Sequence, residues 1–330
     1  MQLNSRGELQ QKFLQNIFKN KALQTNLLPN DASFRQYHRV IVDGTSFILM
    51  DCPPEHYSVT PFINIAEFLL RHDFSAPRIY YINNENGFLL LEDFGSISVR
   101  QYLLNQANPK NQIQTYKLII DILLKLQSVA PPLDLNFYSN ELLLKELELF
   151  TDWYIPFTTG KPIKNELKLE FFELWEQALK KLPNLGISTV LRDYHAENMM
   201  ILNDRGVIQS IGLLDFQDAI IGSPLYDLVS VLEDARVELP QDFTAECFNY
   251  YLAQNPRFNK GDAYLGYNIL GAQRNSRIAG VFARKALRDG QQNYIKYLPW
   301  VLNLLKNDLR HENLKPIKLW MEKQNIINSH

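Results

Sequence analysis

Three oxygen-bearing side chains have the types and the order that phosphoryl transfer requires. Asp193 and Asn198 lie five residues apart in the stretch "LRDYHAENMMIL", and Asp215 follows the apolar residues of "GLLDF". One aspartate can accept the proton of an attacking hydroxyl, while a carboxamide and a second carboxylate can hold Mg²⁺ against a nucleoside triphosphate. Magnesium prefers such hard oxygen ligands. The set predicts a kinase that uses ATP and Mg²⁺, with Asp193 as the catalytic residue and Asn198 and Asp215 as metal ligands.

Each of these residues taken alone has a simpler interpretation, because Asp and Asn are common in turns. The ordered set between apolar, strand-like runs favours the catalytic interpretation. His195 lies in the same bend. It can shape the loop through hydrogen bonds to the backbone, which we favour, or it can bind the substrate.

The elements that must position these residues fall into two parts. Up to about residue 94 the sequence predicts a β-rich part with an inserted helix over 61–71. Its local signals are a capping box at residues 5–8 and a hairpin turn at 43–44. A helix start follows at 60–61 and a second strand pair at 76–95.

Beyond Gly95 the patterns are mainly helical. Helices are predicted over 111–128, 139–153 and 166–181, and over nearly everything after Pro224. Short strands, "STVLR", "NMMIL" and "VIQSIGLLDF", surround the polar bend. We therefore predict an α+β fold with a nucleotide-binding domain at 1–94. A second domain at 95–330 would carry the catalytic loop, the metal site and the substrate helices.

Composition argues against several classes of partner. The net charge is −2, from 34 basic and 36 acidic residues, so nothing marks a nucleic-acid or anionic membrane surface. No apolar run approaches the ~20 residues of a membrane helix, and the N-terminus lacks a signal-peptide pattern. Cys52 and Cys247 form no metal pattern and are interpreted as reduced thiols. We expect a cytoplasmic protein that acts on a small molecule; the oligomeric state stays open.

The motifs "RDYHAENMM", "LLDFQDA" and "SPLYDLVSVLEDA" resemble the phosphotransferase family that includes aminoglycoside and choline kinases. That family's pattern is H-G-D-x-H-x-x-N followed by I-D-F-x-D-A. A closer resemblance is to bacterial kinases that phosphorylate N-acetylmuramate and N-acetylglucosamine at C1 in cell-wall sugar recycling. It rests on "DASFRQYHRV", "FILMDCPPE", "GFLLLEDFG" and "RNSRIAGVFARKALRDG", and covers residues 30–300. The resemblance implies a protein-kinase-like fold of two lobes.

The resemblance also assigns roles to individual positions. Asp193 matches the catalytic base, and Asn198 and Asp215 match the metal ligands. The hinge, whose backbone would hold adenine, corresponds to Leu91, Glu92, Asp93 and Phe94. The phosphate loop corresponds to "NDASFRQY", with Ser33, Phe34 and Arg35 as the predicted contacts.

Two positions depart from the kinase pattern. Met50 stands where protein kinases carry a lysine that pairs with phosphate, and a thioether cannot neutralise phosphate. Arg35 or Arg39 could supply the charge instead. Arg192 stands where many relatives have glycine, and it could anchor the loop by pairing with an acid elsewhere.

The predicted acceptor site draws on the helix "QRNSRIAGVFARKAL". Arg274 and Arg277 lie three residues apart on it and could bind the carboxylate of a sugar acid, although surface arginines are usually just solvated. N-acetylmuramate carries such a carboxylate and N-acetylglucosamine does not. Asp218 could hold the metal loop or reach the sugar, whereas Asp227 is expected to fix the loop.

Two alternatives remain from the sequence. The chain could phosphorylate another small molecule, such as choline, homoserine or an aminoglycoside, with the same three residues and a different pocket. It could also be a pseudokinase that acts as a binding module, which the methionine at position 50 favours and the complete Asp193, Asn198 and Asp215 set opposes.

Overall fold

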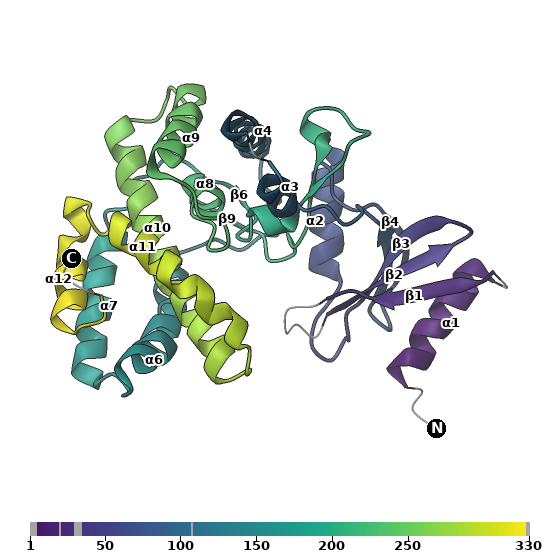
Figure 1. The fold of residues 1–330 in the computed structure, drawn as a ribbon, viewed down its shortest axis with the longest axis horizontal. Helices are drawn as coiled ribbons and strands as arrows, with labels where there is room; N and C mark the ends of the chain where they lie inside the picture. The colour runs from purple at the N-terminus through teal and green to yellow at the C-terminus, as the bar shows by residue number, and fades with distance from the viewer. Residues whose placement is uncertain (1–4, 20, 30–34, 107, 328–330) are drawn as a thin grey trace. The chain divides into compact units, whose positions relative to one another are not determined.

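The computed structural model describes residues 5–19, 21–29, 35–106 and 108–327, and the chain divides into two compact units (Figure 1). Unit 1 combines 1–102 with 197–218, and unit 2 combines 103–196 with 219–330. A sheet in unit 1 and helices in unit 2 confirm the predicted α+β class. The chain passes from one unit to the other inside the polar bend, between Ala196 and Glu197. The division into domains 1–94 and 95–330 stays a prediction.

The sheet of unit 1 has five antiparallel strands in the order β1-β2-β3-β5-β4. They are β1 (Leu23–Leu27), β2 (Gln36–Val42), β3 (Thr45–Asp51), β4 (Ile79–Asn83) and β5 (Phe88–Glu92). The predicted hairpin joins β2 to β3 through Asp43 and Gly44, whose φ angles of 49° and 78° suit a two-residue type I′ turn. Strand β1 was not predicted, because it is an edge strand that is mostly exposed and its sequence LQTNL lacks apolar alternation.

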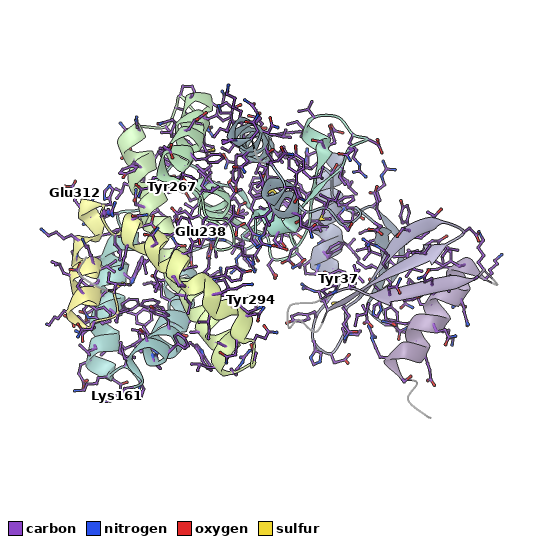
Figure 2. All side chains as sticks on the ribbon, in the orientation of Figure 1. Tyr37, Lys161, Glu238, Tyr267, Tyr294 and Glu312 are labelled. Atoms are coloured by element: carbon purple, nitrogen blue, oxygen red, sulfur yellow. The ribbon has the colours of Figure 1, made fainter. Side chains whose placement is uncertain are left out.

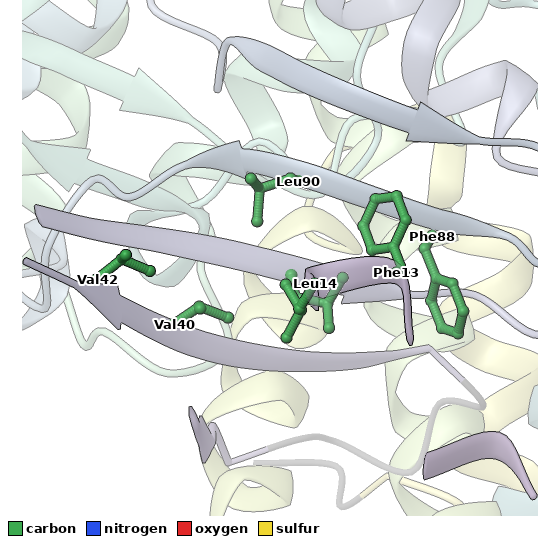
Figure 3. Packing of buried hydrophobic residues seen from close by; sticks show 7 residues of the cluster. Phe13, Leu14, Val40, Val42, Phe88 and Leu90 are labelled. Atoms are coloured by element: carbon green, nitrogen blue, oxygen red, sulfur yellow. The ribbon is translucent and has the colours of Figure 1, made fainter. Parts of the chain in front are cut away.

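Helix α1 (Arg6–Phe18) begins with the predicted capping box, in which Ser5 and Glu8 each accept a hydrogen bond from the other's backbone N–H. Its buried side chains join a cluster with residues of β2, β3 and β5, namely Phe13, Leu14, Val40, Val42, Leu49, Phe88 and Leu90 (Figure 3). The rings of Phe13 and Phe88 stack with centroids 5.5 Å apart. Each fully buried side chain of this size contributes about 1.5–3 kcal/mol, so the cluster fixes α1 on the sheet.

The remaining elements of unit 1 bring the metal-ligand candidates to the sheet. Helix α2 (Thr60–Arg71) forms as predicted, and its Phe62 stacks on Phe216 at 5.0 Å. Strands β7 (Met199–Ile201) and β8 (Ile211–Leu213) pair with each other. Single bridges connect Met200 to Ser98 and Gly212 to Ser75, so the segment after the polar bend belongs to unit 1.

Unit 2 is mainly helical, as predicted. Its longer helices are α4 (Pro109–Ser128), α5 (Asn140–Glu146), α7 (Asn165–Leu179), α8 (Leu225–Leu232), α9 (Gln241–Gln254), α10 (Lys260–Leu287), α11 (Leu298–Asp308) and α12 (Lys315–Lys323). The helix predicted over 139–153 is interrupted: after α5 the chain continues as a π-helix, η1 (Phe150–Tyr154), and then as α6 (Ile155–Thr159). Before the bend, β6 (Ser188–Val190) pairs with β9 (Ile220–Gly222), so the two strands flanking the bend have different partners.

Helix α10 is the central element of unit 2, with 28 residues that pack against α8, α11 and η1. Glycine at position 280 makes one of these contacts possible. A Cβ atom there would lie 2.2 Å from the carbonyl carbon of Leu149. The close backbone approach sets the position of α10, and with it the positions of Arg274 and Arg277.

Candidate active site

A cavity of ≈ 400 Å³ in unit 1 is lined by residues of β2, β3, the hinge and the predicted metal loop. The predicted residues that line it are Arg35, Leu91, Glu92, Asp93, Phe94, Asn198 and Asp215. Ser33 and Phe34, also predicted to contact the nucleotide, lie outside the described residues. The lining combines apolar side chains, among them Leu91 and Phe94, with polar ones, among them Asn198 and Asp215, which suits a ligand with a flat base and a charged tail.

Asp93 holds the hinge through its side chain. Its carboxylate accepts hydrogen bonds from Arg39 at 2.6 and 2.9 Å, from the Gly95 N–H at 2.9 Å, and from the Ser46 hydroxyl. Burial alone would raise the pKa of Asp93, but these hydrogen bonds, chiefly those from Arg39 and Ser46, hold it below its usual value. Because Arg39 also donates to the Gly95 carbonyl at 2.7 Å, it is committed to the hinge.

Glu92 is held by Arg205, a residue that the sequence did not single out. Arg205 pairs with the Glu92 carboxylate, donates to the Ser75 hydroxyl at 2.9 Å and lies over the Phe94 ring at 5.1 Å. The Glu92 N–H donates to the Arg78 carbonyl at 2.8 Å. A base at the hinge would therefore meet the backbone of Asp93 and Phe94 rather than the Glu92 amide.

Asn198 and Asp215 come together in the lining of the cavity. Asn198 Nδ2 lies 3.4 Å from Asp215 Oδ2, and Gln217 donates to Asp215 Oδ1 at 2.8 Å. Asp215 has a φ of 56°, a left-handed conformation that is uncommon for a residue with a side chain and often occurs at functional sites. A carboxylate and an amide oxygen are donors that fit Mg²⁺, which usually takes one or two protein ligands and completes its shell with phosphate and water. Asp218 lies beside them and accepts from Gln217 at 3.2 Å.

The position of the absent lysine faces Tyr37. Met50 is fully buried on β3 and pairs in register with Tyr37 on β2, which is labelled in Figure 2. Tyr37 lines the cavity, and burial raises the pKa of its hydroxyl with a further contribution from the charge of Asp215. Arg35 also lines the cavity, with its guanidinium 4.8 Å above the Tyr57 ring. Of the two arginines considered as replacements for the lysine, Arg35 is the better placed, because Arg39 is committed to Asp93.

The catalytic candidate Asp193 lies in unit 2, in a loop whose backbone is fixed by α8. Asp227 accepts hydrogen bonds from the N–H groups of Leu191 at 2.6 Å and Arg192 at 3.0 Å, and Ser230 donates to the Arg192 carbonyl at 3.1 Å. Asp227 thus has the structural role that we expected, but the loop that it fixes is the one carrying Asp193 and not the metal loop. Arg192 has a φ of 69°, so the chain turns sharply just before Asp193.

Positive charges keep Asp193 ionised. Burial alone would raise its pKa, but the charges of Arg277, His195, Arg274 and Arg192 outweigh burial and hold the pKa below its ordinary value. An ionised carboxylate at neutral pH can accept the proton of a hydroxyl.

His195 is buried, and burial lowers its pKa, although the charge of Asp234 acts in the opposite direction. Asp234 in turn accepts a hydrogen bond from the Ala196 N–H at 3.2 Å. The buried ring thus belongs to the packed end of the loop, an environment consistent with the structural role that we favour.

Arg192 and the two arginines of α10 have different surroundings. Arg192 pairs with Glu146 at the end of α5, which confirms that it anchors the loop through an acid elsewhere. Arg274 is 3% exposed, donates to the Ser230 hydroxyl at 2.8 Å and approaches the Glu233 carbonyl at 3.4 Å. Arg277 contacts the same Glu146 as Arg192, with Nε 3.4 Å from Oε2. Glu146 was not predicted, because its partners are distant in sequence.

Across the part of the chain that the structure describes, no helix combines the length and the apolar character needed to cross a bilayer.

A model of the phosphotransferase enzyme family matches residues 25–263. A curated relative from Neisseria meningitidis serogroup B, N-acetylmuramate/N-acetylglucosamine kinase, is 30% identical over 319 residues, with 92% of each chain covered.

Two solved structures resemble the chain in fold. Choline kinase LicA from Streptococcus pneumoniae has a TM-score of 0.65 at 13% identity, covering 92% of this chain and all of that one. ADP-bound aminoglycoside phosphotransferase APH(2'')-Ib has a TM-score of 0.61 at 15% identity, covering 90% of this chain and 97% of that one. These matches confirm the predicted protein-kinase-like fold.

Proposed function

The chain belongs to the phosphotransferase enzyme family, and from that membership we propose that it is an ATP-dependent kinase of an amino sugar. The proposed acceptor is N-acetylmuramate or N-acetylglucosamine, the two sugars in the name of the relative from N. meningitidis. The proposed reacting group is the anomeric hydroxyl, in agreement with a role in cell-wall sugar recycling.

In the proposed reaction Asp193 accepts the proton of the sugar hydroxyl. The hydroxyl oxygen forms a bond to the γ-phosphorus of ATP while the bond from that phosphorus to the departing ADP breaks. Asn198 and Asp215 would hold Mg²⁺, which neutralises charge on the phosphate oxygens when bound. The low pKa of Asp193 supports this role, since the acceptor must be ionised before the proton moves.

The nucleotide is proposed to bind in the cavity of unit 1. Adenine would contact the hinge, which runs from Leu91 to Phe94, through the backbone of Asp93 and Phe94. The side chains of Arg39 and Arg205 hold this segment in place. The phosphates would extend toward Asp215, with Ser33, Phe34 and Arg35 as the proposed phosphate-loop contacts. A rigid hinge lowers the cost of ordering the site when the base binds.

The observation that carries the proposal is the pairing of Asn198 with Asp215, 3.4 Å apart in the lining of a cavity that the hinge residues also line. Both residues stand at the positions of the family's metal ligands. The buried thiols Cys52 and Cys247 support the further proposal that the enzyme works in the reducing cytoplasm.

A panel of acceptors tests the proposal directly. ADP release is measured with N-acetylmuramate, N-acetylglucosamine, choline and an aminoglycoside, and phosphorus NMR identifies the modified oxygen. We expect turnover with one or both amino sugars and a phosphate at C1. The Asp193→Asn variant should lose at least ~100-fold in kcat while it keeps its nucleotide affinity.

Other outcomes would each point elsewhere. Turnover with only choline or only the aminoglycoside would show that the acceptor is not an amino sugar of the proposed kind. Nucleotide binding without turnover on any acceptor would favour the pseudokinase alternative. Wild-type turnover by Asp193→Asn would reject the assignment of the base.

A further inference from the structure

Glu146 lies between two guanidinium groups in unit 2. It forms ion pairs with Arg192 and with Arg277, and its Oε2 also accepts a hydrogen bond from the Tyr138 hydroxyl. Arg192 additionally lies over the Tyr138 ring at 5.4 Å. One carboxylate thus serves two cations in a largely buried place, where positive charge exceeds what Glu146 alone can balance.

Arg274 and Arg277 of α10 differ in how many of their guanidinium nitrogens contact other protein groups. Arg274 is 3% exposed, and both of its Nη atoms contact groups near α8. The Arg277 side chain keeps 18% of its surface exposed, and among the described residues its contact with Glu146 is through Nε. Its two Nη groups have no protein partner in the part of the chain that the structure describes, so they could donate hydrogen bonds to a ligand.

Arg277 is also the positive charge with the largest influence on Asp193. Among the charges that lower the pKa of Asp193, that of Arg277 comes first. Arg277 also shares the Glu146 carboxylate with Arg192, which directly precedes Asp193, so a group bound by Arg277 would lie close to the catalytic loop.

Resting on the proposed function, we infer that Arg277 binds the carboxylate of an acidic acceptor sugar, and so determines the preference for N-acetylmuramate over N-acetylglucosamine. The planar guanidinium can donate two parallel hydrogen bonds to a carboxylate. The ion pair of Nε with Glu146 already restrains the side chain, so less side-chain entropy is lost on binding. The substrate carboxylate would be a further anionic partner for a guanidinium that now shares Glu146 with Arg192.

The measurement that tests this inference is a ratio of specificity constants. For wild type, Arg277→Lys and Arg277→Gln, kcat/KM is determined with each sugar, and the value for N-acetylmuramate is divided by that for N-acetylglucosamine. Any loss through Asp193 affects both sugars and cancels in the ratio. We expect the ratio to fall about 10- to 100-fold in both variants, mainly through KM, because a charge-assisted bidentate contact is lost.

Arg288→Gln is the matched control. Arg288 follows the same helix and pairs with Asp289 at the surface, so its removal changes the net charge equally and should leave the ratio unchanged. An unchanged ratio in the Arg277 variants, an equal fall in the control, or a wild-type enzyme that phosphorylates N-acetylglucosamine alone would overturn the inference. A wild-type enzyme that phosphorylates neither sugar would instead reject the proposed function.

Discussion

Replacing Asp227 by asparagine probes the carboxyl group that holds the catalytic loop. Asp227 is 1% exposed and accepts the N–H groups of Leu191 and Arg192. Burial raises its pKa from 3.8 to about 7, although these N–H groups and Arg274 oppose the rise. The folded protein therefore keeps a proton on Asp227 at pH values where the unfolded chain has released it.

The sign of the pH effect follows from this difference in bound protons. The stability that protonated Asp227 contributes is fully present below about pH 4 and is lost as the pH rises toward 7. One extra proton in the folded state changes the free energy of unfolding by about 1.4 kcal/mol per pH unit. Between pH 5 and pH 7 the free energy of unfolding of the wild type should thus fall by about 2–3 kcal/mol relative to that of Asp227→Asn, because the asparagine side chain does not titrate.

The amide itself has a cost that does not depend on pH. Asparagine offers one acceptor oxygen to the two N–H groups that Asp227 satisfies, so at pH 5 the variant should be less stable by about 1–3 kcal/mol. The difference in free energy of unfolding between wild type and variant should vanish, or change sign, as the pH approaches 7. Since the loop loses one of its two anchoring bonds, we also expect a lower kcat at every pH.

The assay is urea unfolding followed by tryptophan fluorescence at pH 5, 6, 7 and 8. Ser230→Ala is the matched control, because Ser230 lies on the same helix and bonds the same loop without a titratable group. Its stability curve should run parallel to that of the wild type. If the Asp227→Asn curve is parallel as well, Asp227 is ionised throughout this range, and hydrogen bonds rather than burial determine its pKa.

Two further substitutions test the metal site and the packing of α10. Asp215→Ala should remove the Mg²⁺-dependent part of nucleotide affinity, measured by titrating a fluorescent ADP analogue with and without the metal; an unchanged Mg²⁺ effect would contradict the ligand assignment. Gly280→Ala should lower the free energy of unfolding by about 1–3 kcal/mol or more, because its Cβ would overlap the Leu149 backbone. Gly7→Ala on α1 meets open space and should instead stabilise by about 0.5–1 kcal/mol, so equal urea midpoints for the two variants would reject the packing argument.

Elements with local signals were predicted from the sequence. The capping box at Ser5, the Asp43-Gly44 turn and helix α2 form where the pattern places them, because each depends on residues a few positions apart. Strands β1 and β9 were missed. β1 is an exposed edge, and β9 has three residues, too few to show a period of two.

The candidate site divides in the same way. The order of Asp193, Asn198 and Asp215 is visible in the sequence, and so is a structural role for Asp227, although the loop that Asp227 fixes is not. The partners that hold these groups are not, because they come from distant segments. Glu146 lies 46 residues from Arg192, and Arg205 lies 113 residues from Glu92. Only packing brings such pairs together, and a single sequence contains no periodic signal for it.

The polar bend illustrates why so many charged residues surround one catalytic aspartate. The backbone of a bend has no strand partner, and each buried N–H left unpaired costs about 1–3 kcal/mol. Asp227 and Asp234, from α8 and the residues just after it, accept the N–H groups at the two ends of the bend.

Burial beside other acids would raise the pKa of Asp193 unless cations lay close by. Arg192, Arg274 and Arg277 supply that charge, so the arginines of α10 are required by the loop's own architecture. Both Nη groups of Arg274 are bonded to groups at the end of α8, whereas those of Arg277 have no protein partner among the described residues. The arginines that keep Asp193 ionised therefore include one that can also bind an acidic substrate.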